Sequence, residues 1–124
     1  SAFAVRDLYM THIALTDIDG VGHRYADRLN RAGAHWAGAR ADRYEVWNEN
    51  WRAGLDADGR HRIVADTGTF ALDLTLDAGK APVLQGERGY SRKGQDPGNA
   101  SHYYSLTRMP TTGTIRVGER RVRI

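Results

Sequence analysis

The sequence has no cysteine, only three prolines and no long apolar run. Without cysteine, the chain can have neither a disulfide framework nor a thiolate metal site. No apolar stretch approaches the ~20 residues of a membrane-spanning helix, and no segment has the charged start and short apolar block of a signal peptide. We therefore expect no membrane span, and the cellular compartment is left open.

The excess of one sign of charge is also small. The sequence has 18 Lys and Arg residues and 15 Asp and Glu residues, which gives a net charge of +3. The basic residues are scattered among acidic ones, apart from the last nine residues of the chain. A nucleic-acid-binding surface would need a denser basic stripe. We therefore expect no nucleic-acid partner.

The familiar catalytic motifs are missing as well. The sequence contains no Gly-x-Ser-x-Gly elbow, no His-Glu-x-x-His and no Gly-Lys-Ser phosphate loop. The five histidines are spread over separate segments, so a metal site built from histidine would require coincidence in the fold. We expect no metal and no cofactor.

What is present is β-strand periodicity. Apolar and polar residues alternate over residues 7–17, which predicts a strand. They alternate again over residues 22–29, which we expect to pair with that strand. Residues 61–66 and 69–76 predict a second hairpin, whose Phe70, Leu72, Leu74 and Leu76 form an apolar core face. Residues 114–117 and 120–124 predict a third hairpin. Counting runs between turn signals gives about eight strands, typical of an antiparallel barrel or sandwich.

The middle of the chain is harder to interpret. Residues 30–42 are rich in small side chains, and we expect a loop with at most one helical turn. Residues 44–51 alternate as one strand, which places Glu45, Trp47, Glu49 and Trp51 on one face. On the outside this face would be an aromatic and acidic surface. On the inside, an apolar pocket would raise the pKa of a glutamate enough for it to serve as a general acid.

The stretch from Gly86 to Arg108, GERGYSRKGQDPGNASHYYSLTR, combines turn residues with chemically active groups. Its glycines and Pro97 predict an ordered, tightly folded loop. From Asn99 onward the period of two predicts a strand. Both of its faces are partly polar, so it lines a wet cavity or lies against a polar surface.

GERGYSRKG and GNASHYYSLTR resemble the lipocalin-like family that includes attachment-type (AttH-like) proteins, predicted secreted hydrolases and the carotenoid 1,2-hydratases that make hydroxyneurosporene. Weaker matches lie in LYMTHIALTD, at Arg28 and in FALDLTL. The resemblance implies an all-β, antiparallel lipocalin-like fold. It also implies a bacterial protein of the cytoplasm, the membrane periphery or the periplasm, or a secreted one.

The resemblance also implies a ligand. A cavity with aromatic walls and a few fixed donors suits a small hydrophobic molecule such as a polyene, a carotenoid or a polyketide-like compound. The candidate binding residues are those that combine the matched motifs with polar or aromatic side chains, namely His12, Arg28, Asn99, Tyr103, Tyr104 and Arg108. In complete family members, hydro-lyase or cyclase-type acid chemistry would follow, in which a carboxylic acid protonates an alkene. The alternative is a non-catalytic scaffold whose polar residues form an internal network.

The length fits a single domain over residues 1–124. Members of the family are longer at both ends and continue into a second lipocalin-like domain. We therefore expect a fragment of a two-domain protein, with the acidic residues of the hydratases outside it and no activity of its own. A second lipocalin-like domain or another copy of the chain would be its protein partner.

Overall fold

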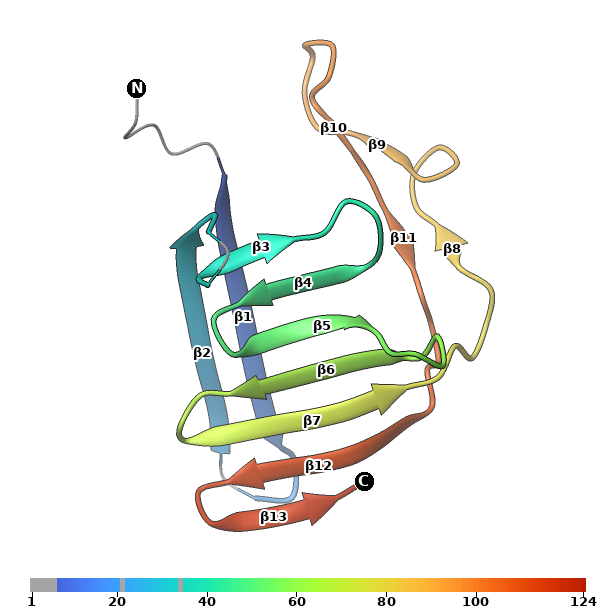
Figure 1. Cartoon of the computed structure of the whole chain (residues 1–124). Helices are drawn as coiled ribbons and strands as arrows, with labels where there is room; N and C mark the ends of the chain where they lie inside the picture. Colours follow the sequence, from blue (N-terminus) through green and yellow to red (C-terminus); the bar gives the residue numbers. More distant parts are fainter. Residues whose placement is uncertain (1–6, 21, 34) are drawn as a thin grey trace. The chain divides into compact units, whose positions relative to one another are not determined.

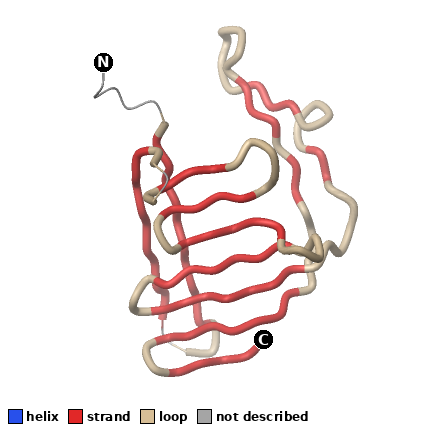
Figure 2. Tube along the Cα trace, viewed as in Figure 1, coloured by secondary structure: helices blue, strands red, loops and turns tan. Residues whose placement is uncertain are grey.

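The computed structural model describes residues 7–20, 22–33 and 35–124. All regular elements among them are β-strands, thirteen in number rather than about eight (Figure 2). The described residues accordingly include no helix that could cross a membrane. They divide into two compact units, one of residues up to 75 together with 112–124, the other of residues 76–111. The prediction of an all-β, antiparallel fold is confirmed.

The first unit contains an open sheet of seven strands in the order β13-β12-β7-β6-β5-β4-β3 (Figure 1). Sequence neighbours pair throughout, except that β7 pairs with β12 after the chain has passed through residues 76–111. Because the order is linear, the described strands do not close into a barrel, and a sandwich-like arrangement is what forms. The strands are β3 (Ala37–Ala39), β4 (Glu45–Asn48), β5 (Trp51–Leu55), β6 (His61–Asp66), β7 (Phe70–Leu76), β12 (Thr111–Val117) and β13 (Arg120–Arg123).

The two faces of this sheet differ in chemistry. Asn48 lies opposite Trp51, and Val46 lies opposite Ala53, so these side chains share one face, here called the inner face. The other face carries ion pairs, including Arg62 with Asp73 at 3.1 Å. Since Asp73 is on that outer face, alternation places Phe70 on the inner one, where it is buried.

A long hairpin runs steeply across the inner face (Figure 1). It consists of β1 (Leu8–Asp17) and β2 (Gly22–Arg31), paired along their full length. Exposure alternates along both strands until the last residue of β1, and the half-buried residues of β1 are Tyr9, Thr11, Ile13 and Leu15. The opposite face of β1, which carries Leu8 and His12, is exposed.

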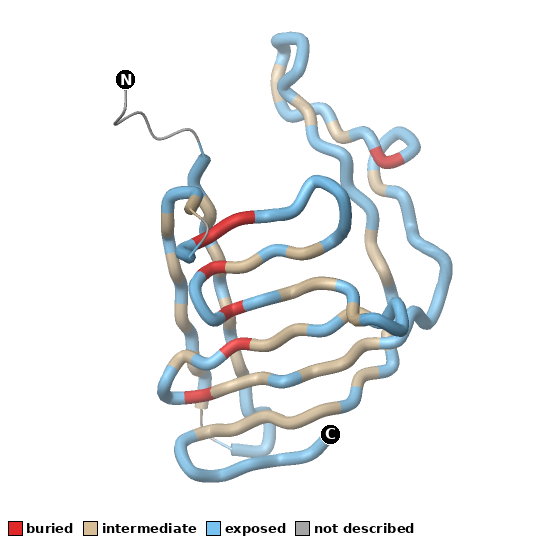
Figure 3. Tube along the Cα trace, viewed as in Figure 1, coloured by how far each residue is buried: buried red, intermediate tan, exposed pale blue. Residues whose placement is uncertain are grey.

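Asn48 and Arg28 hold the hairpin against the sheet. The Asn48 amide donates to the carbonyl oxygens of Tyr9 and Arg28, both at 3.3 Å, and to the Thr11 hydroxyl at 3.2 Å. Its own oxygen accepts from Asn30 at 2.6 Å. In Figure 3 the buried segments of β3 to β7 lie at the same end of these strands, the end from which Asn48 contacts the hairpin.

Residues 44–51 form a hairpin rather than the predicted single strand. β4 ends at Asn48 and β5 begins at Trp51, so Glu49 and Asn50 are the turn. Glu49 has a φ of 56°, a left-handed conformation that costs a non-glycine residue ~1–2 kcal/mol. The turn reverses the alternation, and Trp47 and Trp51 consequently lie on opposite faces. The prediction that Glu45, Trp47, Glu49 and Trp51 share a face is wrong.

The prediction of a loop over residues 30–42 is only partly met in the described part of that segment, which contains strand β3 and no helical turn. Gly38 of β3 lies opposite Trp47, and a Cβ at Gly38 would come within 2.5 Å of the Trp47 ring. The small residues of this segment therefore make room for an indole. By contrast, the predicted pairing of residues 61–66 with 69–76 and of 114–117 with 120–124 is confirmed.

The second unit is a two-stranded ribbon with an interruption. β8 (Val83–Leu84) pairs with β11 (Tyr104–Ser105), and β9 (Tyr90–Arg92) pairs with β10 (Ala100–His102). Residues 85–89 loop out between β8 and β9, where a Cβ at Gly86 would come within 2.4 Å of the Tyr90 carbonyl oxygen. The glycine-rich segment contains strand β9 between its loops, and the strand expected from Asn99 onward is split into β10 and β11.

Candidate functional site

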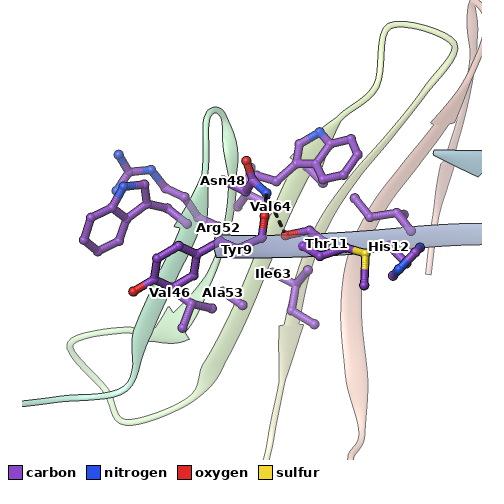
Figure 4. A pocket seen from close by; sticks show the side chains of 14 residues that line it. Tyr9, Thr11, His12, Val46, Asn48, Arg52, Ala53, Ile63 and Val64 are labelled. Atoms are coloured by element: carbon purple, nitrogen blue, oxygen red, sulfur yellow. Dashed lines mark hydrogen bonds between the residues drawn. The ribbon is translucent and has the colours of Figure 1, made fainter. Parts of the chain in front are cut away.

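A cleft of about 390 Å³ lies between β1 and the inner face of the sheet at β4, β5 and β6 (Figure 4). All of its lining residues belong to the first unit. Small-molecule sites in proteins span about 300–1,000 Å³, so the cleft is large enough for a ligand of modest size. It is the candidate site.

Its wall on the sheet is a row of aliphatic side chains. Val46 is opposite Ala53 in the register, and Ala53 is opposite Ile63, so the three lie side by side on neighbouring strands (Figure 4). The facing wall is formed by Tyr9 and Ile13 of β1. Val46 remains 36% exposed, which means that this apolar surface is open to solvent and available to a guest.

A few polar groups border the cleft. His12 borders it, although the side chain of His12 is on the exposed face of β1. The Nδ1 atom of His12 is 3.1 Å from the hydroxyl of Tyr25 on β2, and the two rings stack with their centroids 5.9 Å apart. Arg52 borders the cleft too, but its side chain is on the outer face of the sheet, with Nη1 3.6 Å from Glu45. The polar side chains thus lie at the border of the cleft rather than along its aliphatic wall.

Trp47 has the one buried side-chain nitrogen among the described residues that finds no hydrogen-bond partner. By alternation its ring lies on the outer face of the sheet, over Gly38, so this N–H is not directed at the aliphatic wall of the cleft.

Arg28 supports the site without lining it. Its guanidinium lies 3.9 Å from the centroid of the Trp51 ring, and its Nε is 3.1 Å from Glu49. It also donates to the Asn48 carbonyl at 3.2 Å and to the Asn50 side chain. Arg28 thus fixes the β4–β5 turn and the position of Trp51, a residue that does line the cleft.

The other four predicted site residues are in the second unit. Tyr103 and Tyr104 are consecutive and exposed, at 55% and 59%. The backbone of Asn99 closes the turn that precedes β10, accepting from Lys93 at 2.7 Å. Arg108 follows β11 with a φ of 57°. Within their unit these residues are spread along the ribbon, and that unit's own cleft, of about 490 Å³ beside Tyr90 and Arg92, includes none of them.

Sequence reasoning missed the aliphatic wall and Asn48. The usable signal was the alternation of Val46 with Asn48, which indicates a shared face. It could not be used further, because the turn at Glu49 and Asn50 was not recognised. Without that turn, Val46, Ala53 and Ile63 have no predictable register.

In the β3–β4 loop, Arg40 donates to Asp42 from Nε and Nη2, at 2.9 and 3.0 Å. The hydrogen bond from Arg40 lowers the pKa of Asp42 below its ordinary 3.8. No three His, Asp or Glu side chains in the described part of the chain come together as a metal ion would require.

Comparison with known proteins shows a family and a similar solved structure. Residues 1–124 match the model of a family described as AttH-like. A crystal structure of a candidate AttH from Nitrosomonas europaea superposes with a TM-score of 0.81 at 31% sequence identity, covering 99% of this chain. The chain spans 38% of the length of that protein. No curated protein matches the sequence.

Proposed function

The chain belongs to the AttH-like family, and on this premise we propose that it binds a small hydrophobic molecule in the cleft between β1 and strands β4 to β6. The observation that carries the proposal is the aliphatic row of Val46, Ala53 and Ile63, which lies in register at the wall of a 390 Å³ cleft. Burying apolar surface contributes about 25 cal/mol per Å², so such a wall favours an apolar guest.

The ligand class we favour is a polyene, a carotenoid or a polyketide-like compound. Tyr9 and Trp51 present aromatic surface to the cleft, and aromatic faces stack well on extended unsaturated chains. The aliphatic row of Val46, Ala53 and Ile63 adds apolar surface beside them. A long, unsaturated molecule matches this set of groups.

Binding is the extent of the proposal for residues 1–124. Hydration of an alkene needs a carboxylic acid as proton donor, and none of the described residues that line the cleft is Asp or Glu. Hydratase or cyclase-type chemistry in longer relatives would need a carboxyl group from elsewhere. In that case the cleft positions the chain of the substrate, while the acid comes from another part of the protein.

The test is a fluorescence titration with all-trans-retinol, a neutral polyene, following quenching of the three tryptophans. Val46→Phe should fill the cleft and weaken binding by about tenfold or more, since each ~1.4 kcal/mol changes affinity tenfold. Ala57→Phe is the control, because it adds a benzyl group in the exposed β5–β6 turn.

A wild-type chain whose fluorescence does not respond to retinol or to a second neutral polyene would contradict the proposal. Equal affinities of the wild type and Val46→Phe would contradict it as well. Thermal melting of both variants shows whether a loss of binding reflects a loss of fold.

A further inference from the structure

A second cleft, of about 330 Å³, lies where the turn end of the β1–β2 hairpin meets β12 and β13. It belongs entirely to the first unit and shares no lining residue with the cleft described above. It is therefore a separate site on the same face of the sheet.

The floor of this second cleft is aliphatic. Ile115 of β12 lies opposite Val122 of β13, and alternation places Val117 on the same face. Leu15 of β1 completes the apolar lining. Val122 is 37% exposed, so this patch is open to solvent.

Two arginines also line the cleft, Arg24 from β2 and Arg120 from β13. Seven other arginines form ion pairs with carboxylates, but no ion pair in the described part of the chain involves Arg24 or Arg120. The guanidinium of Arg24 lies over Gly22, 2.9 Å from the place where a Cβ would be. Two guanidinium groups beside an apolar floor are thus available to an anion.

One acid, Asp17, stands among the described residues that line this cleft, and it is already engaged. One carboxylate oxygen of Asp17 accepts from the backbone N–H groups of Asp19 and Gly20, at 3.2 and 3.0 Å. These bonds hold the carboxylate at the hairpin turn. The charge left unmatched at the cleft is positive.

We infer that this cleft binds an alkyl carboxylate, with the carboxylate between Arg24 and Arg120 and the first methylenes on Ile115, Val117 and Val122. Guanidinium and carboxylate match in geometry, because two parallel N–H groups can donate to the two oxygens. The adjoining hydrocarbon covers the aliphatic floor, which separates this ligand class from a purely polar anion. The inference does not depend on the proposed function.

Isothermal titration calorimetry with sodium octanoate and with 1-octanol tests the inference directly. Octanoate should bind more tightly than octanol. Arg120→Gln and Arg24→Gln should each weaken octanoate binding by about tenfold, the scale of one charge-assisted hydrogen bond, and leave octanol binding unchanged. Arg121→Gln is the matched control. Arg121 lies opposite Arg116 in the register of β12 and β13, so its side chain is on the other face of β13, away from the cleft.

Two results would overturn the inference: octanoate binding no tighter than octanol, or equal losses in Arg121→Gln and Arg120→Gln. Arg120 is exposed on a strand at the edge of the sheet, so its variant is expected to fold even if Arg24→Gln does not. Val46→Phe should leave octanoate binding intact, and the arginine variants should leave retinol binding intact. Failure at one cleft is thereby distinguished from failure at the other.

Discussion

Asn48 shows how one amide side chain can connect two layers. It is only 2% exposed, and it donates to groups on both strands of the hairpin while accepting from Asn30. An amide can do this because it carries two donors and an acceptor on one planar group. An aliphatic side chain of similar size could fill the same space but could not join the strands.

We expect Asn48→Leu to lower the free energy of unfolding by about 1–3 kcal/mol, because it leaves buried acceptors and the Asn30 amide without partners. Urea denaturation measures the loss. Gln95→Leu, which removes an exposed amide from the ribbon loop, should have almost no effect. A loss at Asn48 no larger than that at Gln95 would show that the amide does not hold the layers together.

The residue scale is also where prediction from the sequence was weakest. Glu49 and Asn50 form a two-residue turn without glycine, and Glu49 is in a left-handed conformation that glutamate rarely adopts. Asn50 is of a type common in turns, but Glu49 is not, and the pair lacks the glycine of the usual two-residue hairpin signals. The ion pair of Glu49 with Arg28, which lies on another strand, accompanies this conformation, and such a contact is not visible in a local pattern.

Among the elements, strand β12 depends on a glycine where it packs beside β7. Gly113 has a φ of 142°, and a Cβ there would lie 2.0 Å from the carbonyl oxygen of Asp73. Its backbone also exchanges hydrogen bonds with Ile124, at 3.0 and 3.2 Å. A side chain at this position would push apart two strands that are far apart in the sequence.

Gly113→Ala should therefore destabilise the protein by ~1–3 kcal/mol more than Gly118→Ala, which introduces backbone strain but no steric overlap. Gly118 is a fair comparison, since it has a positive φ of 58° and a Cβ added there would meet nothing within 4 Å. The measurement is the midpoint of urea unfolding of both variants. Equal losses would mean that β7 and β12 can separate at little cost.

The elements themselves were predictable wherever side chains alternate clearly. β1, β2, β6, β7, β12 and β13 all follow from a period of two bounded by turn residues. β3 was missed because its three residues, Ala37–Ala39, are too small to show apolar alternation. Their role, in which Gly38 accommodates the ring of Trp47, depends on a residue of another strand.

At the scale of the whole molecule, the two units differ in how their strands are supported. β5 and β6 each have a neighbour on both sides and contribute the buried Trp51 and Ala65. β8 to β11 form two-stranded pairs, and Leu84, Tyr90 and Tyr104 in them are exposed. Isolated two-stranded ribbons are marginally stable in water.

Amide hydrogen exchange should therefore be slower in β5 and β6 than in β8 to β11, by about two orders of magnitude or more. Exchange followed by NMR would compare Ala53 and Ile63 with Ser91 and Tyr104. Similar protection in both groups would contradict this expectation and would indicate that the ribbon opens only when the sheet does.

Fold class was predictable at this scale, but sheet closure and the site were not. Periodicity shows which residues share a face, yet it does not show whether the first and last strands meet, and here β3 and β13 do not pair with each other. The predicted site residues His12 and Arg28 are in the first unit, and Asn99, Tyr103, Tyr104 and Arg108 are in the second. Their joint use in binding stays a prediction, whereas the aliphatic wall of the cleft had to be found in the structure.

The open order of the sheet leaves β13 at an edge among the described strands, and three of its four residues are arginine. Unpaired backbone groups along such a border can recruit strands from other molecules, which is how fibrils begin. Two copies of the chain that approached each other through their β13 edges would bring their guanidinium groups together and repel each other. The arginines of β13, of which Arg120 also lines the second cleft, would thus oppose aggregation at this edge.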